Sequence, residues 1–242
     1  MNAVERLSFE TSHHERIYEH IERNGTVSRD ALLDLVQLGP ERTEEVVRDL
    51  KCDEYVCESD GRLELGLGTG LETTQVSGTA VTVRPARQED LPAIVDAIRR
   101  VIANVLYPSA EDLASRLDVE GVLKRHNDAE TRMFFVATVD GKSVGWVHIG
   151  ASTLQRSRRT VELTLGVRTE YSEQGIGSQL LEHGCGWAAS NTYRKACQRL
   201  PRTNERGLAF LDARNWETKT IRRNHYDRGD ERIDEVMIFV EL

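Results

Sequence analysis

The sequence lacks long hydrophobic runs. No stretch of 18 or more apolar residues occurs in its 242 residues, so we expect no membrane-spanning helix. The N-terminal residues have neither a basic start nor an apolar core of the secretory kind, so we expect no signal peptide and predict a cytoplasmic location. With 39% hydrophobic and 30% charged residues, the composition is that of a soluble, folded protein.

Cysteine and lysine are also scarce. The four cysteines form no CxxC pair and have no histidine at zinc-finger spacing, so we interpret them as reduced thiols and expect neither a disulfide framework nor a metal site. Only five of the 32 basic residues are lysine. This arginine-rich, acidic composition resembles that of proteins from salt-loving archaea, in which a hydrated acidic surface keeps the fold soluble.

The acidic excess is confined to the first part of the chain. Residues 1–70 carry 8 basic and 16 acidic residues, which accounts for the whole net charge of −8, and the remaining residues carry 24 of each. Between the two parts, the stretch 66–80 is rich in glycine and small polar residues and has one charge, Glu72. We therefore predict a linker at 67–80, an N-terminal domain at 1–66 and a second domain at 81–242.

The N-terminal domain is predicted to have three helices followed by a hairpin. Apolar residues at helical spacing indicate helices at 14–23, at 28–36 with Ser28 as its cap, and at 40–51 with Pro40 in its first turn. The turn Asp60-Gly61 predicts a hairpin over 54–65. This order resembles a winged helix-turn-helix module. DNA binding is disfavoured, since the third helix contains four acidic and three basic residues, and a protein contact, a dimer contact or substrate presentation is favoured instead.

The second domain alternates strands and helices. The patterns predict a strand at 81–84, helices at 88–104 and 110–125, and a hairpin of strands 133–139 and 143–149 around Asp140-Gly141. A further strand at 160–167 leads directly into a glycine turn and a helix, and a terminal strand covers 236–242. From the patterns alone, this segment is a single stretch of alternating strands and helices.

The turn after the strand 160–167 is the most informative segment. Gly175 and Gly177 lack the Cβ atoms that would keep a ligand away from the backbone, just where a helix begins. Unpaired amides and the dipole at a helix start favour an anion there. Leu180 stands where a dinucleotide-binding fingerprint needs its third glycine, and no Gly-Lys-Ser/Thr ending for a P-loop occurs. The turn therefore predicts a pyrophosphate site of another kind.

Four segments in order resemble the GNAT family of acetyl-CoA-dependent N-acetyltransferases over about residues 82–242. The turn 172–177 is similar to the family's Gln/Arg-x-x-Gly-x-Gly/Ala loop, although Ser172 replaces the usual basic or amide residue. The stretch 203–216, the opening 83–91 and the ending 221–237 are similar to the family's Asn-Glu-Arg helix, first strand and helix, and last hairpin. The resemblance implies the α+β class and the GNAT fold, a mixed, mostly antiparallel central sheet flanked by helices, with acetyl-CoA as co-substrate.

The resemblance also implies positions for the cofactor. Backbone groups of Leu165, Gly166 and Val167 would pair with the pantetheine arm. Asn204 would contact that arm, and in the simpler reading it caps the next helix. The pyrophosphate would be held by a continuous run, namely Ser172, Glu173, Gln174, Gly175, Ile176, Gly177 and Ser178.

The candidate catalytic residues are Glu162 and Tyr226. Strand alternation places Glu162 on the face opposite the apolar residues, where it could accept the amine proton or form a structural ion pair with an arginine. Many relatives use a tyrosine of the Asn-Glu-Arg helix as the acid, but Leu211 occupies that position here. Either the thiolate leaves without a proton donor, or another donor such as Tyr226 takes the place of the missing tyrosine. His148 and His225 are further candidates for the acceptor cleft.

Two functions follow from this. The first is transfer of an acetyl group from acetyl-CoA to a primary amine, on a protein or a small molecule, through a ternary complex. The second is a transcriptional regulator that senses acetyl-CoA and binds DNA through its winged helix. A homodimer stays open in either case.

Overall fold

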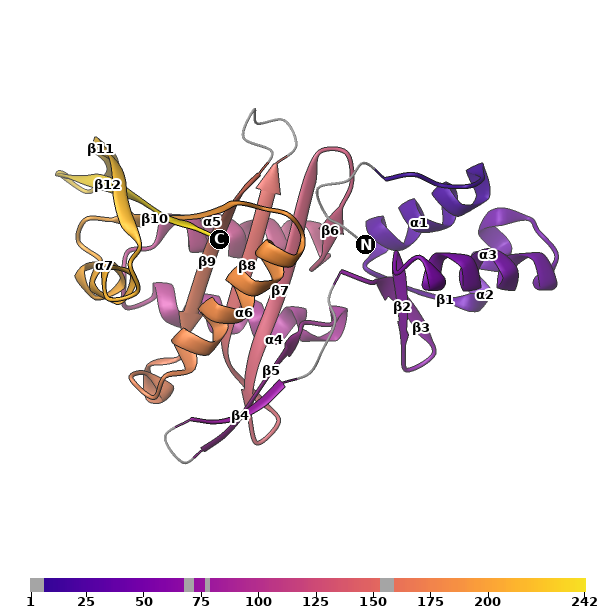
Figure 1. Ribbon diagram of the computed structural model, residues 1–242, viewed down its shortest axis with the longest axis horizontal. Helices are drawn as coiled ribbons and strands as arrows, with labels where there is room; N and C mark the ends of the chain where they lie inside the picture. The colour runs from indigo at the N-terminus through magenta and orange to yellow at the C-terminus, as the bar shows by residue number, and fades with distance from the viewer. Residues whose placement is uncertain (1–6, 68–71, 77–78, 153–158) are drawn as a thin grey trace.

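The computed structural model describes residues 7–67, 72–76, 79–152 and 159–242, which form two sheets with helices around them (Figure 1). The N-terminal unit lies at one end of the molecule, and the hairpin of the last two strands lies at the other. Within the described residues, no helix has both the length and the apolar character needed to cross a membrane.

The N-terminal unit contains the three predicted helices and the predicted hairpin. Its elements are α1 (Ser12–Asn24), β1 (Thr26–Ser28), α2 (Arg29–Val36), α3 (Pro40–Cys52), β2 (Val56–Ser59) and β3 (Arg62–Leu65). The hydroxyl of Ser28 accepts a hydrogen bond from the amide of Ala31 as the cap of α2, and Pro40 opens α3. Strand β1 was not predicted, and it pairs with β3 in a sheet of order β1-β3-β2. The winged-helix identification itself stays a prediction.

The second sheet has nine strands, in the order β11-β12-β10-β9-β8-β7-β5-β4, with β6 paired to β7. Its strands are β4 (Glu72–Val76), β5 (Thr79–Pro85), β6 (Arg125–His126), β7 (Glu130–Val139), β8 (Lys142–Ser152), β9 (Thr160–Val167), β10 (Lys195–Pro201), β11 (Glu217–Arg228) and β12 (Glu231–Glu241). Among the described pairings of this sheet, only β9 with β10 is parallel. The predicted mixed, mostly antiparallel sheet is therefore confirmed.

Two predicted segments are corrected by the structure, and other predicted elements differ from it at their ends, such as the last strand, which begins at Glu231 rather than at Val236. The segment 67–80, predicted as a linker, contains β4, which pairs antiparallel with β5, while its residues 68–71 and 77–78 lie outside the described residues. The helix predicted to reach Arg125 ends at Glu120, because Gly121 adopts a left-handed conformation (φ 64°) that stops it. Arg125 instead belongs to β6.

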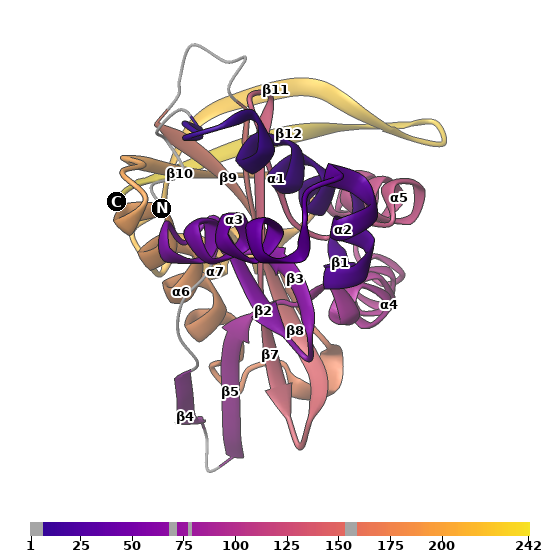
Figure 2. The same ribbon diagram turned by 90° about the vertical axis from the view of Figure 1, so that its right-hand side faces the viewer.

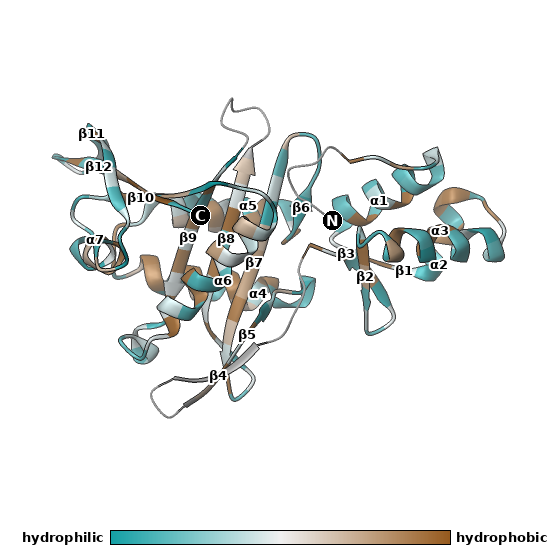
Figure 3. Cartoon of the chain, in the orientation of Figure 1, coloured by the Kyte–Doolittle hydropathy of each residue, from teal (hydrophilic) through white to brown (hydrophobic). Residues whose placement is uncertain are grey.

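Helices cover both faces of the large sheet. They are η1 (Gln88–Asp90), α4 (Leu91–Ile102), α5 (Pro108–Glu120), η2 (Thr169–Tyr171), α6 (Ile176–Ser190) and α7 (Glu205–Asp212). Gly184 of α6 faces Val147 on one side of β8, whereas α4 reaches the opposite side, where Val101 lies against Gly166. The central strands β7, β8 and β9 carry much of the apolar surface that these helices bury (Figure 3).

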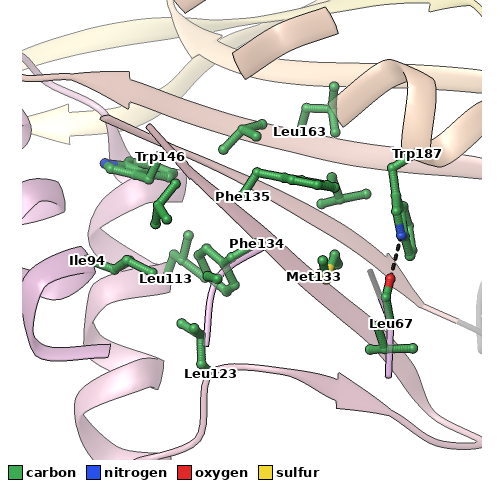
Figure 4. Packing of buried hydrophobic residues seen from close by; sticks show 14 of the residues in the cluster. Leu67, Ile94, Leu113, Leu123, Met133, Phe134, Phe135, Trp146, Leu163 and Trp187 are labelled. Atoms are coloured by element: carbon green, nitrogen blue, oxygen red, sulfur yellow. Dashed lines mark hydrogen bonds between the residues drawn. The ribbon is translucent and has the colours of Figure 1, made fainter. Parts of the chain in front are cut away.

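The N-terminal unit is fixed to the large sheet by buried polar contacts. Lys124 Nζ lies 2.8 Å from the carbonyl of Leu65 and 3.1 Å from the carboxylate of Glu64, and both charged side chains are buried. The hydroxyl of Tyr18 donates to the carbonyl of His126 over 2.7 Å. Farther along the chain, the indole of Trp187 donates to the carbonyl of Leu67 over 2.6 Å, beside the aromatic core of the sheet (Figure 4).

Candidate active site

A cavity of about 1130 Å³ opens at the carboxyl end of β9. Its lining comes from the end of α4 and the connection to α5, from the end of β9 and the turn that follows, and from β10 and α7. The lining includes Arg100, Tyr107, Leu165, Gly166, Val167, Ser172, Glu173, Gly175, Gly177, Ser178, Gln198, Asn204, Arg206, Leu211 and Arg214. A single cavity therefore brings together segments that lie up to about a hundred residues apart.

The cavity exists because β9 and β10 separate. Their parallel pairing ends where Cys197 lies opposite Glu162, and β9 continues to Val167. In the separated part, the amide of Leu165 donates to the hydroxyl of Tyr107 over 3.4 Å, whereas the amide of Arg168 donates to β8. Because alternate amides of a strand point to opposite sides, the amide of Val167 points the same way as that of Leu165. A ligand in the gap can pair with both.

The turn before α6 has the geometry that its two glycines predict. Gly175 caps α6 with φ 86°, a region that disfavours side chains, and Glu173 is also left-handed at φ 62°. The first amides of a helix have no acceptor within the helix, and α6 is 15 residues long, so its start favours an anion. Of the seven residues predicted for the pyrophosphate, five line the cavity, while Ile176 is buried in the core and Gln174 lies outside the lining.

Asn204 reaches the cavity as the cap of α7. Its side-chain oxygen accepts a hydrogen bond from the amide of Gly207 over 3.0 Å, and the residue is buried. The capping role foreseen for Asn204 is thus present. The side-chain amide of Asn204 keeps donor capacity beyond this cap, and the residue lines the cavity.

Three arginines line the cavity that the sequence did not single out. Arg214, just after α7, donates to the hydroxyl of Ser178 over 2.5 Å, and its guanidinium lies 3.9 Å from the centre of the Phe210 ring. Arg206 lies 3.2 Å from the carboxylate of Glu173 at the turn. Arg206 and Arg214 thus place positive charge near the turn and the start of α6, and Arg100 adds a third cation to the lining, which suits a phosphate-bearing ligand.

Tyr107 is a second residue that the sequence did not reveal. It is buried and lines the cavity, and burial raises the pKa of its phenol well above the usual range, so the hydroxyl keeps its proton. Leu211, which stands where relatives have a tyrosine, also lines the cavity and is buried. Tyr107 therefore supplies a phenol to the same cavity from the start of α5.

Glu162 lies outside this lining and is held by Arg199. The two side chains form a bidentate pair, with nitrogen–oxygen distances of 2.9 and 2.8 Å. The negative charge of Glu162 adds to burial, the larger cause, in raising the pKa of Tyr107. The sequence suggested either a proton acceptor or a structural ion pair for Glu162, and the ion pair with an arginine is present.

Tyr226 lies on β11, where its hydroxyl donates to Glu235 over 2.5 Å. Burial raises the pKa of Tyr226 well above its usual range, and the adjacent carboxylate raises it further. Glu235, on β12, is fully buried. Its carboxylate also forms an ion pair with Arg222, with a nitrogen–oxygen distance of 3.2 Å. His225 lies 3.7 Å from the same carboxylate. These residues form a group on the last hairpin, outside the cavity lining.

His148 faces the core of the sheet. Its ring centre lies 5.0 Å from that of Phe134, and burial lowers its pKa to about 3. A histidine in that environment stays neutral at ordinary pH. The sequence made His148 a candidate for the acceptor cleft, but the residue lies outside the lining of the cavity.

Comparison with known proteins finds a family match over the segment that supplies most residues of the cavity lining. Residues 130–216 match the model of the acetyltransferase (GNAT) domain, and this range spans β7 to α7. No curated protein matches the sequence. The chain thus contains a GNAT acetyltransferase domain, and the strand separation, the glycine turn and the start of α6 all lie within it.

Solved structures of acetyltransferases share the fold. A GNAT-family acetyltransferase from Streptococcus pneumoniae is 20% identical, with a TM-score of 0.55, and the match covers 67% of this chain and 99% of that one. The ribosomal-protein-S18-alanine N-acetyltransferase from Escherichia coli is 21% identical, with a TM-score of 0.51, over 66% of this chain and 93% of that one. A proposed acetyltransferase from Salmonella typhimurium, solved with its cofactor acetyl-CoA, is 14% identical, with a TM-score of 0.54, over 66% of this chain and 93% of that one.

Proposed function

We propose that this chain, whose residues 130–216 form an acetyl-CoA-dependent GNAT acetyltransferase domain, transfers the acetyl group to a primary amine in a ternary complex. One observation carries the proposal. The cavity joins the exposed amides of β9 to the start of α6, so that a thioester arm and a pyrophosphate could be held at once. The space beside Tyr107 is left for the acceptor.

Acetyl-CoA fits the residues that line the cavity. Backbone groups of Leu165, Gly166 and Val167, apart from the Val167 amide, would pair with the pantetheine arm, and Asn204 would contact it from α7. The backbone from Ser172 to Ser178 would hold the pyrophosphate, with Arg214 adding the charged contact that Ser172 cannot supply. When the cofactor binds, Arg206 could release its ion pair with Glu173 and bind a phosphate oxygen instead.

The chemistry requires the amine nitrogen to lose two protons and the leaving thiolate to gain one. A primary amine has a pKa of about 10 and must lose a proton before its nitrogen can attack the acetyl carbon. We assign this step to Glu162 through a water molecule, since its carboxylate lies outside the cavity wall. As the nitrogen–carbon bond forms and the carbon–sulfur bond breaks, the amide of Val167 is placed to stabilise the negative oxygen.

The leaving thiolate gains a proton. We propose Tyr107 as its donor, because its protonated phenol lines the cavity beside Leu165. Tyr226, the donor suggested by the sequence, is directed toward Glu235 instead. The attacking nitrogen loses its second proton as the amide forms, and we propose that water carries this proton to the phenolate left on Tyr107, while the first proton, accepted by Glu162, is released to solvent. The protons then balance over one turnover.

For the N-terminal unit we propose a role in contacts with other proteins. We keep the winged-helix-like assignment for residues 12–66 within this proposal. The exposed charged residues of α3 are Glu41, Arg42, Glu44, Arg48 and Lys51, and the half-buried Glu45 and Asp49 bring the helix to four acidic against three basic residues. It therefore offers no predominantly positive surface to a phosphate backbone.

The decisive experiment combines binding with turnover. Calorimetry with acetyl-CoA and CoA, at low and at high salt, should show binding of both. Acetyl transfer is then measured against an amine panel that includes polyamines, amino acids and a peptide with N-terminal alanine, the last because of the Escherichia coli structure. Binding without transfer to any amine would favour the sensor, and absence of binding at every salt level would overturn the proposal.

A further inference from the structure

A separate cluster of potential metal ligands lies between α1 and α3 in the N-terminal unit. Glu10 precedes α1, His14 lies in its first turns, and Asp49 lies near the end of α3. One ligand atom from each residue lies within 4.8 Å of the others. Figure 2 shows α1 and α3 packed near each other at the end of the molecule that faces the viewer.

The imidazole of His14 is buried and has one nitrogen without a hydrogen bond. The residue is 6% exposed, and its Nδ1 lies 2.8 Å from the hydroxyl oxygen of Thr11. Its Nε2 is buried without a hydrogen-bond partner among the described atoms, and lies 3.6 Å from a carboxylate oxygen of Asp49. A buried nitrogen so placed costs free energy unless something binds it.

The tautomer decides what can bind there. The hydroxyl of Thr11 already accepts the amide of His13, and it can also accept a proton from His14 Nδ1. In that tautomer, Nε2 presents a lone pair toward the carboxylate of Asp49, and the two repel each other. A cation bound between Nε2 and the carboxylate would be coordinated by both and would remove this repulsion. The hydrogen bond from His14 Nδ1 to Thr11 would then fix the orientation of the imidazole.

The spacing matches that of ligands around one metal ion. Zinc binds nitrogen and oxygen ligands at about 2.0–2.2 Å, so two ligands of a tetrahedral site lie about 3.3–3.6 Å apart. The separation of His14 Nε2 and the Asp49 oxygen is 3.6 Å. Glu10 is exposed and within reach as a third ligand, and water can complete the shell.

We propose that Glu10, His14 and Asp49 bind a divalent transition metal ion, zinc above all, that joins the start of α1 to the end of α3. An imidazole ligand favours zinc over magnesium and calcium, which prefer oxygen. The net charge of −8 over residues 1–70 attracts a cation to this unit. The site lies in the N-terminal unit, whereas the cavity lining comes from residues 100–214, so this proposal does not depend on acetyl transfer.

The test uses the full chain after treatment with a chelator. At a hundredfold excess of zinc over its Kd, we expect the Tm to rise by about 5–10 °C, with magnesium giving no comparable rise. Cobalt in place of zinc should give the visible absorption of a tetrahedral site. The variants His14→Gln and Asp49→Asn should each lose most of the zinc shift.

Matched variants serve as controls. His20→Gln changes another histidine of α1, and Glu45→Gln changes another acidic residue of α3; both should keep the full zinc shift. If His14→Gln fails to fold, Asp49→Asn decides, because the Asp49 side chain is 40% exposed and tolerates the change. A zinc shift that is absent in the unaltered chain, or equal in Asp49→Asn, would overturn the proposal.

Discussion

Arg214 donates a hydrogen bond to the hydroxyl of Ser178 over 2.5 Å, although 36 residues separate them in the chain. The contact joins the residue after α7 to the first turn of α6. The guanidinium is held from a second side, because its other nitrogen donates to the carbonyl of Phe210 over 2.7 Å. A positive charge is thereby fixed beside the amides at the start of α6, where a phosphate would bind.

Replacing Arg214 by Met should weaken acetyl-CoA binding about 10- to 100-fold, since a charge-assisted hydrogen bond contributes about 1.5–3 kcal/mol. Calorimetry measures the Kd directly. Arg223→Met, on the exposed strand β11, is the matched control and should bind as the unaltered chain does. Equal affinity of both variants would show that Arg214 does not contact the cofactor.

Gly177→Trp should abolish measurable acetyl-CoA binding while the protein stays folded. A Cβ at this position would lie 3.6 Å from the ring of Phe210, an ordinary contact, so the first carbon fits and the indole fills the cavity. Gly186→Trp makes the same change farther along α6, where a Cβ meets open space, and should bind normally. Retained binding by Gly177→Trp would contradict the proposed pyrophosphate site.

Tyr107→Phe should lower kcat about 10²- to 10⁴-fold, the usual contribution of a positioned acid, with little change in the Kd of acetyl-CoA. Tyr171→Phe removes another phenol from the same cavity and serves as the control. Steady-state kinetics with a good acceptor distinguishes them. If Tyr107→Phe keeps its kcat and Tyr226→Phe loses it, the proton donor is Tyr226.

Glu162→Gln should lower kcat/KM for the acceptor by at least about 10²-fold if the carboxylate accepts the amine proton. The control is Glu170→Gln, which removes a carboxylate from the cavity wall. Because Arg199 loses its partner in the first variant, the Tm must be measured as well. Unchanged turnover with a lower Tm would show that Glu162 contributes to stability through its ion pair and does not accept the amine proton.

Acid should destabilise the fold partly through His126. Burial lowers the pKa of His126 to about 4, against about 6.5 in the unfolded chain. Its stabilising effect is thus present above pH 6.5 and is lost as the pH falls toward 4, by about 2 kcal/mol at pH 5. Urea unfolding at about pH 7.5 and pH 5 should show a smaller pH-dependent loss in His126→Gln than in His20→Gln. Equal losses in the two would assign the acid sensitivity to other groups.

The sequence predicted the elements that depend on neighbouring residues. Strand β9 has the predicted bounds, Thr160 to Val167, because its apolar alternation and the glycines that follow define it locally. The left-handed Gly175 and the cap formed by Asn204 also depend on a few consecutive residues. The strand β4 was missed because small polar residues between glycines give no periodic signal, and its pairing with β5 supplies the order.

The residues around the site depended on packing instead. Arg199 and Glu162 pair because β10 lies beside β9 in the sheet, a pairing that no local pattern specifies. Tyr107 and Arg214 reach the cavity from different elements, since α4, α5 and α7 are placed by the apolar surfaces that they bury. Local sequence determined where the backbone turns and which amides become available, because both follow from short-range sterics and hydrogen bonding. Which charges and phenols face those amides was decided only when distant elements packed together.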